Sequence, residues 1–175
     1  MNSPIHPGSY PQPPFCQKEV CLSIAHYYSV MRQRLSEVYG DRIRFSLTSV
    51  PSCVIVSVVE YALSFTAALS ARLLLTVCRA PRMVAALRED ADGGISLTFS
   101  AATSPDGASK VAPDAYRELF AGIASRGGFT CTVEGGDAVT VTVGLRRSPS
   151  APTELRAALA TAERDPFADA LAYPL

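Results

Sequence analysis

The chain has 175 residues, which is enough for one domain with a short appendage. It is 48% hydrophobic and 18% charged, a composition that fills a core and excludes wholesale disorder. Its 16 basic and 16 acidic residues cancel, and the basic ones are scattered along the chain. The charge pattern therefore favours neither nucleic acid nor a membrane surface as a partner.

The five cysteines are odd in number and form no CxxC pair, which argues against a zinc cluster or a disulfide framework. Reduced thiols in a cytoplasmic protein are the expected state. The N-terminal residues lack a basic region followed by an apolar one, so we expect no signal peptide there.

The first predicted elements are an arm and a helix. Residues 1–15 contain five prolines and no acidic or basic residue, which predicts an extended arm. Within residues 17–39, apolar residues recur at spacings of three and four: Val20, Ile24, Tyr27, Met31, Leu35 and Val38. This pattern predicts an amphipathic helix that ends at Gly40. Its apolar stripe needs a cover, either a homodimer through residues 17–39 or the protein's own sheet.

A strand and a long apolar segment follow. Residues 42–48 alternate apolar and polar side chains, which predicts a strand. Residues 52–69 are predicted to be a helix, with Pro51 in its first turn and Ser49 as its cap. The segment is long enough to cross a membrane, but hydroxyl side chains interrupt it and no basic or aromatic residues flank it. We therefore expect a buried helix and no membrane span.

The remaining pattern completes an α+β fold. Its expected elements are strands 73–79, 83–89 and 95–100, helix 113–125, strands 129–134 and 138–145, and a short tail helix 153–164. The order predicts a two-layer α/β sandwich, a mixed sheet with helices on one face, preceded by the amphipathic helix. The corresponding divisions are an arm 1–15, a helix 16–40, a domain 41–147 and a tail 148–175.

Two stretches carry a family resemblance. Ser57–Thr66 reads SVVEYALSFT, and Ala115–Leu145 reads AYRELFAGIASRGGFTCTVEGGDAVTVTVGL, a helix that ends in Gly-Gly before two strands. The first is similar to the NLLxNAxKFT helix motif of sensor histidine kinases, and the second to the closing segment of their ATP-binding domain. From Arg42 to Leu145 the element order resembles that domain. It belongs to the GHKL superfamily, which includes gyrase, heat-shock chaperones and mismatch-repair ATPases.

The resemblance implies an ATP site with Mg²⁺, but the helix motif lacks its ligands. The second Asn of the family motif helps to hold the cation, which needs oxygen ligands. Tyr61 stands at that position and Ser57 at the first Asn, while Asn2 is the only Asn in the chain. Glu60 can in principle hold a cation or act as a base. With Ser64 one turn on, we expect it instead to face solvent or to cap the helix.

The other nucleotide motifs are also reduced. The family places DxGxG after the central hairpin, where its Asp binds adenine. Asp106-Gly107 is the only candidate here, and Pro105-Asp106-Gly107 is an ordinary turn signature. SKVAPDAYREL stands in place of the glycine-rich phosphate lid, and Lys110 within it is a candidate phosphate contact. We therefore expect no cofactor, although the resemblance implies ATP and Mg²⁺.

His26 is the candidate phosphoacceptor. The family's acceptor histidine is followed by an acidic and then a basic residue, whereas Tyr27, Tyr28 and Ser29 follow His26. The family's dimerisation domain also needs two helices, and only one fits before the first strand. We expect a surface or half-buried histidine. No Walker loop, GxSxG or HExxH motif is present.

Three functions remain open. The first is a non-catalytic relative of the kinase domain, a pseudokinase that binds a protein such as a response regulator or kinase in two-component signalling. The second is a histidine phosphotransferase that uses His26 and keeps the ATP domain as a scaffold. The third is a weak nucleotide binder without hydrolysis. All three are expected to be cytoplasmic, without a nucleic-acid or membrane partner.

Overall fold

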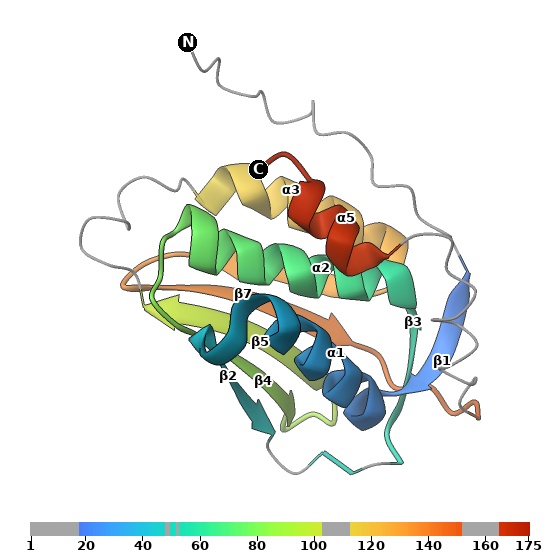
Figure 1. Ribbon diagram of the computed structural model, residues 1–175. Helices are drawn as coiled ribbons and strands as arrows, with labels where there is room; N and C mark the ends of the chain where they lie inside the picture. The colour runs from blue at the N-terminus through green and yellow to red at the C-terminus, as the bar shows by residue number, and fades with distance from the viewer. Residues whose placement is uncertain (1–17, 48–49, 52, 103–112, 152–164) are drawn as a thin grey trace.

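The computed structural model describes residues 18–47, 50–51, 53–102, 113–151 and 165–175 (Figure 1). The predicted arm 1–15 and the predicted tail helix 153–164 lie outside these residues.

The centre of the fold is a five-stranded sheet in the order β2-β4-β5-β7-β6. Its strands are β2 (Ile43–Leu47), β4 (Met83–Glu89), β5 (Ile95–Ala102), β6 (Thr130–Glu134) and β7 (Ala138–Leu145). β2 pairs with β4 in parallel and the other neighbours are antiparallel, so the sheet is mixed. All five strands were predicted, β2, β6 and β7 from alternating side chains and β4 and β5 as a hairpin around the turn 90–94, and those predictions are confirmed.

Three helices, α1 (Ile24–Tyr39), α2 (Glu60–Arg72) and α3 (Pro113–Gly127), lie on one face of the sheet (Figure 1). The inward residues of β7 are buried in alternation: Val139, Val141, Val143 and Leu145. The residues on the opposite face of β7 are mainly small or polar, such as Thr140, Thr142 and Gly144. The predicted two-layer α+β sandwich is confirmed.

A second sheet of two strands was not predicted. β1 (Glu19–Ser23) pairs antiparallel with β3 (Ile55–Val59), where the sequence analysis expected helices. β3 is a run of β-branched residues around one serine, and such side chains fit a strand better than a helix. The chain after β7 continues this sheet, because the Ser148 N–H donates to the Ile55 carbonyl at 2.8 Å.

The predicted strand 73–79 is also wrong. Residues Leu73–Val77 form a π-helical turn that continues α2, and the Cys78 N–H donates to the Leu73 carbonyl at 2.8 Å. Three consecutive leucines after a helix prolong it readily, since leucine is a good helix former. The guanidinium of Arg42 then donates to the carbonyls of Leu75 and Ala80 at 2.9 and 3.0 Å.

The apolar stripe of α1 is covered by the protein's own core. Its buried residues are Ile24, Tyr27, Tyr28, Met31 and Leu35. The Tyr28 hydroxyl lies 2.8 Å from the carbonyl oxygens of Ser46 and Ala85, on β2 and β4. α1 is thus part of the sandwich, and its stripe no longer argues for a homodimer through residues 17–39.

A C-terminal helix, α5 (Pro166–Ala172), packs against α2 and was not predicted (Figure 1). The Asp165 side chain caps it by accepting from the Phe167 N–H at 3.0 Å. Its buried residues are Pro166, Phe167 and Ala170. No helix in the described part of the chain has the length and apolar character to cross a membrane.

Candidate functional site

The helix that the sequence analysis singled out is the most enclosed element of the fold. Every residue of α2 from Glu60 to Ala71 is buried. α1 and α3 pack beside it and α5 lies along it, as Figure 1 shows. A nucleotide site on this helix would have to be built from side chains that already contact one another.

Glu60 opens α2 and is only 7% exposed, so the expectation that it faces solvent is wrong. The Ser64 hydroxyl donates to its Oε1 at 2.9 Å, and Ser64 Oγ also lies 2.8 Å from the Tyr27 hydroxyl. Burial raises the pKa of Glu60, the Ser64 hydrogen bond opposes this rise, and the negative charge of Asp165 adds to it. This pKa shift favours the neutral carboxyl.

Tyr61 belongs to an aromatic cluster between α2 and the C-terminal segment. Its ring stacks on Phe65 with centroids 6.2 Å apart, and Tyr173 meets Phe65 edge-on at 5.4 Å. The Tyr61 hydroxyl donates to the carboxylate of Asp169 on α5. The position equated with the second Asn of the family motif is thus used for packing between two helices.

Ser57 does not lie on this helix. It is the third residue of β3, and its hydroxyl donates to Glu19 Oε1 at 2.8 Å. The interpretation of Ser57–Thr66 as one helical motif is therefore wrong, because the strand-to-helix boundary falls between Val59 and Glu60. The structure brings Glu60 and Tyr61 to the start of α2 and leaves Ser57 on the small sheet.

These side chains do not fit an Mg²⁺–nucleotide site. A hard cation needs accessible oxygen ligands. Glu60 is the only carboxylate on α2; it is buried, already accepts a hydrogen bond, and has a raised pKa. The described residues contain no group of three or more His, Cys, Asp or Glu side chains placed to hold a metal ion. Asp106, Gly107 and Lys110 lie outside the described residues.

His26 is exposed in the first turn of α1. Its main-chain N–H donates to the hydroxyl of Ser23, the N-cap of the helix, at 3.4 Å. The structure thus places His26 at the start of a helix whose buried face belongs to the sandwich.

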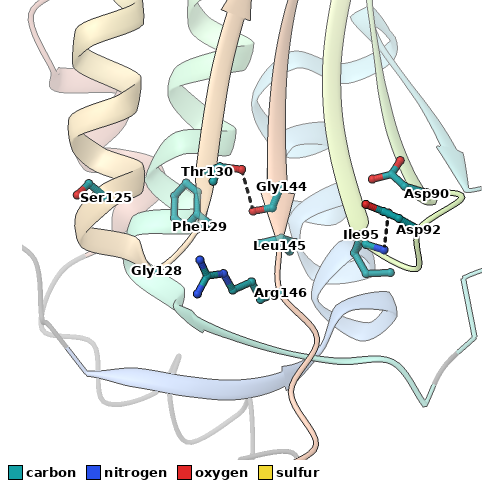
Figure 2. Close-up of a pocket in the computed structure, with 11 residues that line it drawn as sticks. Asp90, Asp92, Ile95, Ser125, Gly128, Phe129, Thr130, Gly144, Leu145 and Arg146 are labelled. Carbon is teal, nitrogen blue, oxygen red and sulfur yellow. Dashed lines mark hydrogen bonds between the residues drawn. The ribbon is translucent and has the colours of Figure 1, made fainter.

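A pocket of about 490 Å³ lies at the end of the sheet where β5 begins and β7 ends (Figure 2). It is lined by Asp90, Asp92, Gly94, Ile95, Ser125, Gly128, Phe129, Thr130, Gly144, Leu145 and Arg146. Two aspartates and one arginine, all exposed, supply its charge. The paired residues Thr130 and Gly144 leave room there, since a Cβ on Gly144 would lie 2.4 Å from Thr130 Oγ1.

This pocket has no continuous signature in the sequence, because its residues come from the β4–β5 turn, the segment between α3 and β6, and the end of β7. The only local signal was the glycine at the end of β7. β5 starts at the pocket with Ile95 and runs toward residues 103–112, which include the predicted adenine contact. Strand rise separates Ile95 from Ala102 by roughly 23 Å, so the pocket lies at the opposite end of β5 from Ala102.

The architecture defines the class of fold. The protein has a GHKL-like ATPase fold, that of histidine-kinase ATP-binding domains. The solved structures that it resembles include the mycobacterial sensor histidine kinase MprB (TM-score 0.54, 12% identity, 76% of this chain and 100% of that one). They also include the ATP-binding domain of PrrB from Mycobacterium tuberculosis (TM-score 0.52, 17% identity, 76% and 99%).

Full-length ShkA in complex with AMPPNP is a third similar structure, with a TM-score of 0.53 and 13% identity. The match covers 80% of this chain and 33% of ShkA, so the likeness concerns one part of that kinase. A scan against protein-family models and a search of curated proteins find no match. Structural similarity at such low sequence identity establishes the fold alone.

Proposed function

We propose that the protein is a non-catalytic relative of the histidine-kinase ATP-binding domain and acts as a protein-interaction module in bacterial-type signalling. A fold does not carry an activity by itself, so the proposal rests on the residues of α2. Its expected partners are a response regulator or a kinase.

The observation that supports the proposal is the enclosure of α2. The helix has no amide side chain, its one carboxylate bonds to Ser64, and Tyr61 bonds to the C-terminal segment. A nucleotide site needs polar groups that are free to meet phosphates and a cation. On α2 those positions contribute to packing and stability instead.

Calorimetric titration with Mg-ATP and Mg-ADP up to millimolar nucleotide tests the proposal. We expect no binding heat and no rise in Tm, since a ligand that binds only the native state stabilises it by mass action. The ATP-binding domain of PrrB serves as the positive control. Saturable binding would contradict the proposal and favour the weak nucleotide binder.

The phosphotransferase alternative depends on His26. Under the proposed function, incubation with a phosphorylated response regulator leaves no acid-labile phosphate on the chain. Transfer that is seen in the wild type and lost in His26→Gln would contradict the proposal. Ser29→Ala, a change at another exposed α1 position, is the matched control.

A further inference from the structure

The C-terminal segment 165–175 contacts the rest of the protein as a ligand contacts a receptor. Its contacts fall on one surface, here named the docking face, which consists of Arg34, Tyr61, Phe65 and Arg72. Arg34 lies on α1 and the other three on α2. α5 has only seven residues, and a helix of that length is unstable in water without packing. Packing on the docking face therefore stabilises α5 as a helix.

The buried residues of the segment have the spacing of a helix bound in a groove. They are Pro166, Phe167, Ala170 and Tyr173, while Leu171 is 44% exposed. The intervals from Pro166 to Ala170 and on to Tyr173 are four and three, the anchor pattern of amphipathic helix ligands. Tyr173 meets Phe65 at 5.4 Å, and Phe167 lies under the Arg34 guanidinium, 5.2 Å from the ring centroid.

Polar contacts fix the direction of the segment along α2. Arg34 pairs with Asp165 at its start, Tyr61 donates to Asp169 in its middle, and Arg72 donates to the carbonyl oxygens of Ala170 and Tyr173 at its end. The docking face offers donors and two positive charges, and the segment offers acceptors and two negative charges. This complementarity defines what the face recognises.

We propose that the docking face is a binding site for a short amphipathic partner helix, and that residues 165–175 occupy it in competition with that partner. The partner helix has an acidic N-cap, an aromatic residue two positions later and a second carboxylate one turn on. The inference rests on the proposed function as an interaction module and names the chemistry of the partner. A tethered segment acts at an effective concentration typically on the order of millimolar. A partner helix at lower concentration must therefore bind the docking face more tightly than residues 165–175 do in order to displace them.

The test is the binding of a fluorescent peptide, DPFADALAYPL, to three full-length chains, measured by anisotropy. We expect Phe167→Ala/Tyr173→Ala, which weakens the tethered segment, to bind the peptide at least tenfold more tightly than the wild type. Leu171→Ala changes an exposed residue of the same helix and should match the wild type. A peptide with alanine in place of Phe167 should bind at least tenfold more weakly than the unchanged peptide.

A folded double variant that binds no peptide, or binds it as the wild type does, would overturn the proposal. If the double variant does not fold, Asp165→Asn/Asp169→Asn replaces it, since that change removes only the charged contacts. Light scattering identifies the other occupant: a wild-type dimer that Phe167→Ala/Tyr173→Ala dissociates would place a second copy on the face and exclude the partner helix. Nucleotide binding without loss of peptide binding would contradict the proposed function alone.

Discussion

The Tyr61 hydroxyl on α2 donates a hydrogen bond to the Asp169 carboxylate on α5, across 108 positions of the sequence. This contact joins α2, which the sequence resemblance equates with an ATP-site helix, to a segment that follows the sandwich. Tyr61 therefore packs between two helices.

Tyr61→Phe tests the energy of this contact. We expect it to lower the free energy of unfolding by about 1.5–3 kcal/mol, the range for a hydrogen bond to a charged group. Urea denaturation of Tyr61→Phe, Asp169→Asn and the double variant gives the interaction free energy between the two side chains. Additive losses in that cycle would show that the two side chains do not interact in solution.

Glu60→Gln tests the buried carboxyl at the start of α2. The pKa of Glu60 is raised above its ordinary value of about 4.5, so the folded state holds its proton more tightly than the unfolded state. Its contribution to stability is full below pH 4.5 and falls as pH rises through the raised pKa. The amide keeps an acceptor for Ser64 without a charge, so we expect Glu60→Gln to be more stable than the wild type at pH 7.

Thermal unfolding from pH 4 to pH 8 provides the measurement. The advantage of Glu60→Gln should shrink toward zero at pH 4, where the wild-type carboxyl is protonated. Glu37→Gln removes a carboxylate from an exposed position of α1 and is the matched control. A constant difference between Glu60→Gln and wild type across this range would contradict the burial argument.

Arg42→Ala should destabilise the end of the π-helical turn. Its guanidinium donates to the carbonyls of Leu75, Ala80 and Pro81, and the loss of those donors should cost about 1–3 kcal/mol. Arg42→Lys keeps the charge but not the planar fork, so an intermediate loss is expected in urea denaturation. Wild-type stability in Arg42→Lys would mean that charge alone suffices.

Two glycines of α3 should respond in opposite directions to the same change. A Cβ at Gly122 meets no atom within 4 Å, so Gly122→Ala should stabilise the helix by about 0.5–1 kcal/mol. A Cβ at Gly127 would lie 2.2 Å from the Phe129 ring and 2.9 Å from Ala62 Cβ. Gly127→Ala should therefore lower Tm, and equal shifts in both variants would refute the packing argument.

The sequence predicted the central sheet well because β7 alternates strictly and a glycine-containing turn separates β4 from β5. Val139, Val141 and Val143 face the core while Thr140 and Thr142 face away, and a period of two has no helical interpretation. The Gly-Gly stop after α3 was equally informative, since Gly128 has a φ of +77°, a conformation that glycine adopts most easily.

The sequence was ambiguous between Val54 and Leu75, where every residue is buried or half-buried. A continuous apolar run has no polar face to reveal its period, so strand β3 was interpreted as helix and the leucines after α2 as strand. Because β3 was interpreted as helix, Ser57 and Tyr61 were both placed on one helix. In the structure Ser57 lies on β3 and Tyr61 on α2.

The docking face could not be predicted from sequence. Phe167, Ala170 and Tyr173 form a pattern only two turns long, too short to distinguish from chance. The docking-face residues Arg34 and Tyr61 lie more than 100 positions before the segment that they contact, and no local rule connects the two. Only the folded chain shows that these residues meet.

The long separation between α2 and its cover also has a consequence during synthesis. At typical rates of 5–20 residues per second, about 5–20 s pass between the appearance of Tyr61 and that of Asp169. Through that interval the aromatic side of α2 lacks the segment that later shields it. Until α5 is made, we expect this apolar side of α2 to be open to chaperones and to aggregation.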